Sequence, residues 1–287
     1  MKKAKLIDKD IVVLYHADCK DGFGAAWAAW KKFGNQAEYI PVYHGRAVPQ
    51  GLQGKEIYML DFTYDEPHTS KLIASNKRVT AIDHHLSQKE ITKSTYKHSF
   101  NNNHSGAVLA WKYFHPVQRV PKLLSYVEDQ DLWKFKLHDT LELCTYINAL
   151  ERKFSVWEKL AADFENPEHI GHYAEEGKLL VQYNDRLMRD IAKEARDVEF
   201  AGYRACAVNA PHRFASLIAQ MLYKKSLFSI IWNERKDRIH VSLRSNKGTF
   251  NVATLAQKFG GGGHPHSAAF YLPLESRLPW KTVEKDV

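Results

Sequence analysis

The sequence has no long apolar run and few cysteines. No stretch approaches the roughly 18–20 consecutive apolar residues that a membrane-spanning helix needs, so we expect no membrane partner. The three cysteines, Cys19, Cys144 and Cys206, are odd in number and far apart. That spacing argues against a disulfide framework and shows no paired-cysteine zinc site. These absences favour a soluble protein of the cytoplasm.

Other absences point the same way. The first residues include lysines, but Asp8, Lys9 and Asp10 interrupt them before a secretory apolar segment could form. There is no low-complexity tract and no repeat of fixed period. The composition, 44% hydrophobic and 26% charged, is instead that of a globular protein able to bury a substantial core. The net charge of +8 would attract anions such as nucleotides, nucleic acids or polyphosphate, although scattered lysines also serve solubility.

The first half of the chain alternates short apolar runs with segments of helical composition. The strand candidates are residues 11–15, 38–43, 56–60 and 78–82. Pro41 pushes the second of them toward a sheet edge, because proline lacks the N–H that a central strand donates. The helix candidates are residues 22–33, 66–76, 106–114 and 121–129. Such alternation predicts an α/β domain with a mostly parallel sheet flanked by helices.

The second half differs in pattern. Residues 151–198 are charged and helical, which suggests a helical linker between a first domain, 1–150, and a smaller α/β domain, 199–287. In that smaller domain, strands are expected at 203–209, 227–233 and 238–245, and helices at 214–225 and 252–259. We expect a cleft between the two domains, its width set by the linker.

Acids and histidines follow three of the early strand candidates at their carboxyl ends. They are His16, Asp18 and Asp21 after the first, Asp61 after the third, and Asp83, His84 and His85 after the fourth. In open parallel sheets, ligands bind beyond the carboxyl ends of the strands. A single Asp or His at such a place is usually a turn or surface residue, but the same coincidence at three strands predicts a site.

So many carboxylates in one crevice would repel each other strongly unless cations were bound. Carboxylate oxygens suit magnesium and manganese, and the added imidazoles shift the preference toward manganese or another transition metal such as cobalt. The number of ligands exceeds what one zinc ion takes and suits two ions about 4 Å apart that share a carboxylate, an arrangement used in phosphoryl transfer.

The pattern resembles the DHH phosphoesterase superfamily, named for its Asp-His-His motif. Residues 16–26, HADCKDGFGAA, are similar to the first motif, Asp61 to the second and 83–85 to the third. The fourth motif is an acid after a helix, and 125–133, SYVEDQDLW, offers both Asp129 and Asp131. Asp129 is preferred because it closes the predicted helix. The run FGGGGHPHSAAF at 259–270 is similar to the DHH-associated substrate domain.

The resemblance implies a role for each motif residue. One divalent ion would be held by His16, Asp18 and Asp61. The second would be held by Asp21, Asp61, His84 and Asp129 (or Asp131), with Asp61 shared by both ions. Asp83 would orient a histidine from outside the ligand set, as imidazole ligands generally require. His85 would face the scissile phosphate, and a water acidified by both ions would attack it.

A second anion site is expected in the smaller domain. Consecutive glycines allow main-chain N–H groups to approach an anion closely, where a Cβ would interfere. Arginine presents a planar fork of donors that fits phosphate oxygens. The residues expected to bind substrate here are Arg244, Ser245, Gly261, Gly262, Gly263 and His264.

The sequence therefore predicts a phosphodiesterase with two divalent metal ions, manganese first, that hydrolyses short single-stranded oligonucleotides from an end to nucleoside monophosphates. Alternatives within the same enzyme class are nucleotide bisphosphates, linear or cyclic dinucleotides, and polyphosphate. A non-catalytic nucleotide-binding module is the alternative from another class.

Overall fold

The computed structural model describes residues 7–17, 19–43, 47–222 and 226–283. The chain forms two compact units, residues 1–181 and 182–287. The boundary lies inside the long helix α8 (Pro167–Lys193). The structure therefore divides the chain within the segment expected to be a separate linker.

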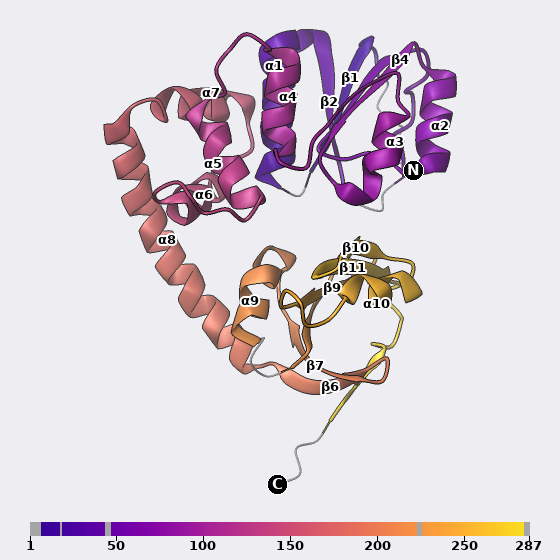
Figure 1. Ribbon diagram of the computed structural model, residues 1–287, viewed down its shortest axis with the longest axis vertical. Coiled ribbons are helices and arrows are strands. Elements are labelled where there is room, and N and C mark those ends of the chain that lie inside the picture. The colour runs from indigo at the N-terminus through magenta and orange to yellow at the C-terminus, as the bar shows by residue number, and fades with distance from the viewer. Residues whose placement is uncertain (1–6, 18, 44–46, 223–225, 284–287) are drawn as a thin grey trace. The chain divides into compact units, whose positions relative to one another are not determined.

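The first unit is built on a five-stranded parallel sheet of order β2-β1-β3-β4-β5 (Figure 1). Its strands are β1 (Ile11–His16), β2 (Ala37–Val42), β3 (Glu56–Leu60), β4 (Arg78–Asp83) and β5 (Lys97–Phe100). The α/β class with a parallel sheet is confirmed, and β2, which contains Pro41, is an edge strand as expected. The sequence KHSF of β5 has no apolar run, and the strand was not predicted.

Helices cover both faces of this sheet. They are α1 (Lys20–Phe33), α2 (Glu66–Ser75), α3 (Lys89–Lys93) and α4 (Gly106–Phe114). Three further helices, α5 (Lys122–Asp131), α6 (Thr140–Ala149) and α7 (Phe154–Asp163), pack mainly on other helices. In β1, Val12 and Leu14 belong to the core on one face, whereas Val13 belongs to the core on the other. A strand buried on both faces needs a continuous apolar run, which is why IVVLY is typical of a parallel sheet.

The first half of the expected linker is part of the first core. Trp157 is 1% exposed, Leu160 3% and Phe164 0%, and all three belong to the same core as α1 and α4. Burial of large side chains supplies the main favourable term in folding, so α7 stabilises the first unit instead of standing apart from it. Neither expected end of the linker, residue 151 or residue 198, coincides with the boundary between the two units, which follows residue 181.

The second unit contains a seven-stranded sheet of order β10-β11-β9-β8-β7-β6-β12 (Figure 1). Its strands are β6 (Arg196–Phe200), β7 (Tyr203–Asn209), β8 (Phe228–Glu234), β9 (Ile239–Ser245), β10 (Gly262–His264), β11 (Ser267–Leu272) and β12 (Trp280–Thr282). Its helices after α8 include α9 (Ala215–Leu222) and α10 (Val252–Lys258). β7 and β8 pair in parallel and the other pairs are antiparallel, so this unit is α/β in content but not doubly wound.

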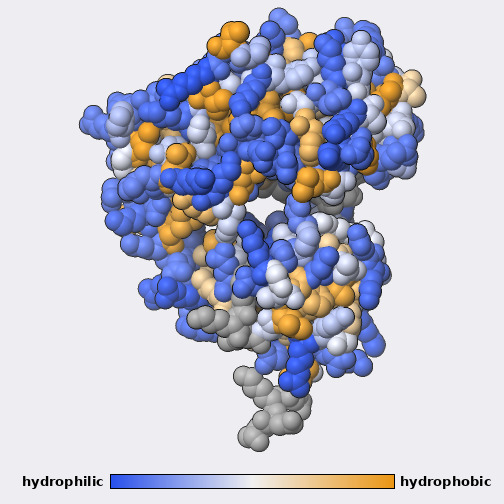
Figure 2. Space-filling model, in the orientation of Figure 1, coloured by the Kyte–Doolittle hydropathy of each residue, from blue (hydrophilic) through white to orange (hydrophobic). Residues whose placement is uncertain are grey.

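The surface in view is mainly hydrophilic, with apolar side chains scattered among charged ones (Figure 2). Within the described ranges, every helix is too short or too polar to cross a lipid bilayer.

Candidate active site

The three central strands of the first sheet bring polar residues to one edge. β1 and β4 both pair with β3, with Tyr15 opposite Leu60 and Leu60 opposite Ile82. The next residues along the three strands are His16, Asp61 and Asp83, which therefore lie level with one another at the carboxyl edge. The sequence prediction that these strand ends meet is thus matched by the register of the sheet.

Asp61 lies at the centre of this edge. Its backbone turns into the left-handed region, with φ of 60°, and its N–H donates to the carbonyl of Ile82 at 2.9 Å. Aspartate tolerates this conformation better than most residues. Oδ2 lies 3.4 Å from Nδ1 of His16, and Oδ1 lies 3.2 Å from Nε2 of His84. The side chain is almost fully buried, yet Oδ1 accepts no well-directed hydrogen bond from the described residues.

Asp21 is fixed by the first turn of α4. Its Oδ2 accepts a hydrogen bond from the N–H of Gly106 at 2.6 Å, and its Oδ1 accepts one from the N–H of Ala107 at 2.9 Å. These donors belong to the positive end of the helix dipole, which favours a carboxylate. Ser105 caps the same helix by accepting from the N–H of Val108.

Gly106 also touches the central carboxylate. A Cβ at this position would lie 2.6 Å from both Cβ and Oδ1 of Asp61, closer than real atoms approach. The start of α4 therefore needs glycine so that the helix can hold Asp21 and pack against Asp61 at the same time.

The structure corrects the preference for Asp129. Helix α5 continues to Asp131, whose Oδ2 lies 3.6 Å from Nε2 of His84. Residues i and i+2 of a helix lie about 200° apart around its axis, so Asp129 and Asp131 point to opposite sides. Asp131 therefore joins His84 and Asp21, and Asp129 does not. The sequence prediction placed the end of the helix two residues too early.

Asp129 binds the segment that follows the helix. It accepts hydrogen bonds from the N–H groups of Lys136 and Leu137, both at 3.0 Å, and from the hydroxyl of Thr140 at 2.6 Å. Burial would raise the pKa of Asp129, but these donors hold the pKa below its usual value. Its role is to organise the chain after α5.

Asp83 is directed at the histidine pair that follows it. Its Oδ1 accepts from the N–H groups of His84 at 2.7 Å and His85 at 3.1 Å, and lies 2.7 Å from Nδ1 of His85. Its Oδ2 accepts from the hydroxyl of Thr63 at 3.0 Å, and Thr63 in turn contacts the hydroxyl of Thr92. This is the arrangement of an orienting carboxylate. The two threonines were not predicted from sequence, because nothing local distinguishes them.

The pKa values of Asp21, Asp61 and His84 show that these side chains interact strongly with one another. Burial, followed by the neighbouring acids Asp61 and Asp131, raises the pKa of Asp21 well above its usual value. Burial also opposes ionisation of Asp61, but the imidazoles of His16 and His84 hold its pKa well below normal. Burial would lower the pKa of His84, yet the surrounding acids raise it to about 10. The raised pKa values favour a proton on Asp21 and on His84, and bound cations would displace these protons.

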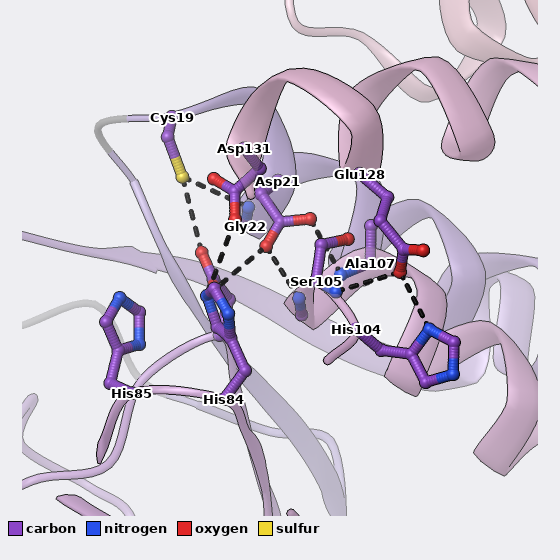
Figure 3. A network of polar contacts seen from close by, with 12 residues as sticks. Cys19, Asp21, Gly22, His84, His85, His104, Ser105, Ala107, Glu128 and Asp131 are labelled. Carbon is purple, nitrogen blue, oxygen red and sulfur yellow. Dashed lines mark hydrogen bonds and ion pairs between the residues drawn. The ribbon is translucent and has the colours of Figure 1, made fainter. Parts of the chain in front are cut away.

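The side chains fit divalent cations. Three sets each bring ligand atoms within 4.8 Å of one another: His16, Cys19 and Asp61; Asp61, His84 and His85; Asp21, His84 and Asp131. A buried carboxylate oxygen without a well-directed donor, such as Oδ1 of Asp61, is typical of a metal ligand. Figure 3 shows Cys19, Asp21, His84 and Asp131 directed toward one another. Asp18 lies outside the described residues.

Cys19 was not predicted to contribute. Its Sγ lies 3.3 Å from Nδ1 of His16 and 3.3 Å from Oδ2 of Asp61, and it accepts from the N–H of Gly22, which caps α1. Burial, and then the adjacent acids, raises the pKa of this thiol well above its usual value. A thiol that stays protonated is a poor nucleophile, so Cys19 supports the site by capping the helix and donating to Asp61.

In the second unit, pairing across three strands aligns two of the expected anion ligands. Arg244 of β9 lies opposite Ser267 of β11, and Ser267 lies opposite His264 of β10. Residues directly opposite share a face of the sheet, so Arg244 and His264 lie on one face, about 10 Å apart. Ser245 is on the other face, buried, with its hydroxyl donating to the carbonyl of Phe250. It is not brought to the same row.

The glycine run has two different surroundings. A Cβ at Gly261 would lie 2.1 Å from the carbonyl oxygen of Ala269, and one at Gly263, where φ is 141°, would lie 2.5 Å from that of Ser267. These two glycines allow β10 to approach β11. Gly262, by contrast, faces open space. Of the three, only Gly262 has room beside it for an anion.

Comparison with known proteins adds a domain assignment. Residues 209–280 match the DHHA1 domain family. The chain is also 28% identical over 310 residues to an uncharacterized protein, R106, of Acanthamoeba polyphaga mimivirus, covering 98% of this chain and 73% of that protein.

Solved structures share the fold at low sequence identity. The DHH domain of a protein described as belonging to a family of ribosomal proteins has a TM-score of 0.60 at 12% identity, covering 92% of this chain and 83% of that chain. An exopolyphosphatase-related protein from Bacteroides fragilis has a TM-score of 0.50 at 16% identity, with 94% and 88% covered. At these identities the likeness concerns the arrangement of the backbone.

Proposed function

We propose that the chain is a divalent-metal-dependent phosphoesterase of the DHH superfamily, and that it hydrolyses short oligonucleotides from an end to nucleoside monophosphates. The match of residues 209–280 to the DHHA1 domain family supports this assignment. The observation that carries the proposal is the convergence of His16, Asp61 and His84 at one sheet edge, with a buried carboxylate oxygen that lacks a well-directed donor. The expected location, the cytoplasm, is part of the same proposal.

Two ions are proposed, with Asp61 shared between them. His16 and Asp61, together with Asp18, would hold one ion. Asp61, Asp21, His84 and Asp131 would hold the other, with Asp131 in place of the preferred Asp129. Mixed carboxylate and imidazole ligands favour manganese over magnesium, and cobalt is also compatible. When bound, such ions supply an acidified water and neutralise charge on the phosphoryl group.

Protein groups around this centre would orient and protonate the substrate. Asp83 orients the ring of His85 through Nδ1. We place this ring beside the scissile phosphate. His85 would donate a hydrogen bond to the phosphate or a proton to the leaving oxygen. Its pKa is raised because the hydrogen bond with Asp83 and the charge of Asp61 outweigh the effect of burial, which alone would lower it. A raised pKa favours the protonated, donating form.

The second unit would bind a phosphate beyond the scissile one. Arg244 and His264 offer cationic or donor groups on one sheet face, and Gly262 has an open side. Arg244 is held by its own contacts, with Nε donating to the hydroxyl of Ser216 at 3.3 Å. Ser245, Gly261 and Gly263 would support this region through the backbone.

A substrate panel tests the proposal. Purified protein with Mn²⁺ is incubated with a dinucleotide, a tetranucleotide, a long single strand, a cyclic dinucleotide and polyphosphate. We expect the short linear oligonucleotides to be cleaved fastest. Faster release of phosphate from polyphosphate would favour the activity to which the name of the Bacteroides protein refers, and equal rates at all lengths would contradict the preference for short chains. Binding without turnover in Mn²⁺, Mg²⁺ and Co²⁺ would favour a non-catalytic module.

A further inference from the structure

The segment that follows α5 and the candidate ligand Asp131 carries two exposed aromatic side chains. Trp133 is 48% exposed and Phe135 is 39% exposed. The segment begins directly after Asp131, the ligand candidate that ends the helix. The two rings touch each other, and exposed apolar side chains that lie together mark a binding site more often than single ones do.

The backbone holds both rings in this exposed position. Trp133 has φ of 56° and Phe135 has φ of 46°, a left-handed conformation that bulky residues rarely adopt. Strained backbone of this kind persists only when the surroundings enforce it, and it clusters at binding sites. The two ring centroids are 5.0 Å apart with planes at 85°, so the rings meet edge to face. With this backbone conformation, the rings of Trp133 and Phe135 are both exposed.

Asp129 is the residue that enforces the conformation. Its carbonyl accepts from the N–H groups of Lys134 at 2.8 Å and Phe135 at 3.3 Å, while its carboxylate accepts from the N–H groups of Lys136 and Leu137. Four consecutive amides are therefore tied to one residue at the end of α5. The aromatic pair is in place before any ligand arrives, which lowers the entropic cost of binding.

Lysines alternate with the rings in the sequence WKFK. Nζ of Lys134 lies 3.7 Å from Oε1 of Glu128, and Lys136 is exposed. Aromatic faces next to cationic side chains are the surface on which proteins stack the bases of single strands while attracting the phosphates.

We propose that Trp133 and Phe135 form a stacking platform for the nucleobase next to the scissile phosphate, with Asp129 as its positioning residue. This inference rests on the proposed function and narrows its substrate class: a nucleobase is required, which polyphosphate does not have. The platform would select nucleotides by their π faces, without reading the base sequence.

The affinity of the protein for a reaction product tests this inference without relying on turnover. Adenosine monophosphate carries adenine at the carbon where ribose 5-phosphate carries its anomeric hydroxyl, and the affinities of both are measured by calorimetry with Mn²⁺ present. For the wild-type protein we expect adenosine monophosphate to bind roughly 5- to 150-fold more tightly, the range of one base stacked on an aromatic ring. Trp133→Ala and Phe135→Ala should each reduce this ratio, and the double variant should bring it within about twofold of one.

Matched variants identify the cause. Trp133→Phe should retain most of the ratio, whereas Trp133→Leu, apolar but not aromatic, should lose it. Tyr96→Ala should leave the ratio unchanged. Tyr96 is 72% exposed, but it lies just before the amino end of β5, whereas the candidate site lies at the carboxyl ends of the strands. Melting temperatures confirm that each variant is folded.

A wild-type ratio near one, or variants that keep the ratio, would overturn the inference. Variants that change only the oligomeric state on sedimentation would also overturn it, in favour of a protein contact. Hydrolysis of a dinucleotide by the wild-type protein, measured separately, decides the proposed function. The two results are independent, so loss of one leaves the other readable.

Discussion

The two oxygens of Asp61 face two different imidazoles: Nδ1 of His16 lies 3.4 Å from Oδ2, and Nε2 of His84 lies 3.2 Å from Oδ1. His16 ends β1 and His84 directly follows β4, so Asp61 connects two sets of ligand atoms that share no other residue. A carboxylate in that position is suited to contact two cations at once.

Asp61→Asn should abolish binding of both ions, whereas His84→Ala should weaken mainly one. The physical reason is that Asn lacks the charge shared by both sets, while His84 belongs to the sets on one side. We expect hydrolysis to fall at least about 100-fold in each variant. Bound metal is counted by elemental analysis after gel filtration. Asp65→Asn is the control, because Asp65 is an exposed N-cap of α2 and asparagine caps equally well. Retention of two ions by Asp61→Asn would contradict a shared ligand.

Asp131→Asn should weaken metal binding, whereas Asp129→Asn should lower the stability of the fold. Asp131 faces His84, so its variant should lose metal affinity roughly 10- to 100-fold with little change in stability. Asp129 is buried and accepts three hydrogen bonds, so its variant should lose about 1–3 kcal/mol of unfolding free energy. Metal titration and urea unfolding separate the two. Loss of metal affinity in Asp129→Asn alone would restore it as the ligand.

Divalent cations should stabilise the first unit. Burial, and then the neighbouring acids Asp61 and Asp131, raises the pKa of Asp21, and cations relieve that repulsion. At a free Mn²⁺ concentration 100 times the dissociation constant, the gain is about 2.7 kcal/mol. The melting temperature should rise with Mn²⁺, fall again with chelator and respond little to Na⁺. The same shift in His84→Ala would place the cations elsewhere.

Gly106→Ala should damage the site, and Gly171→Ala should not. A Cβ at position 106 would overlap Asp61, and overpacking of this kind costs about 1–3 kcal/mol. Gly171 lies in α8 with no atom within 4 Å of the added Cβ, so alanine there should raise stability by about 0.5–1 kcal/mol through helix propensity. Chemical unfolding and Mn²⁺ affinity are measured for both. Unchanged Mn²⁺ affinity in Gly106→Ala would show that the helix does not position Asp61.

Much of the first unit could be predicted because its central strands are buried on both faces. Continuous apolar runs identify β1, β3 and β4, the first followed by His16 and the other two by an aspartate. Among the strands that escaped prediction, β5 and β12 are short and lie at sheet edges, where side chains need not be apolar. β6, β10 and β11 of the second sheet were also missed. Whether such a segment pairs depends on its neighbour in space, which a local pattern does not contain.

The site was predictable to the same degree. Polar residues that directly follow strands were found, since sequence position fixes their place in a parallel sheet. Thr63 and Gly106 were missed, because their contacts arise only when separate segments pack. The choice between Asp129 and Asp131 turned on two residues of helix length, and helix ends are the least certain feature of a sequence prediction.

The first turn of α4 is bonded to Asp21 and pressed against Asp61, so this one helix acts as a spacer between two carboxylates. The far side of the spacer rests on aromatic residues, with Trp111 of α4 stacked on Trp27 of α1. Substitutions among those buried rings would shift the helix and change the gap that an ion must fill. Metal preference in this protein is therefore open to alteration from the hydrophobic interior, by residues that touch neither ion nor substrate.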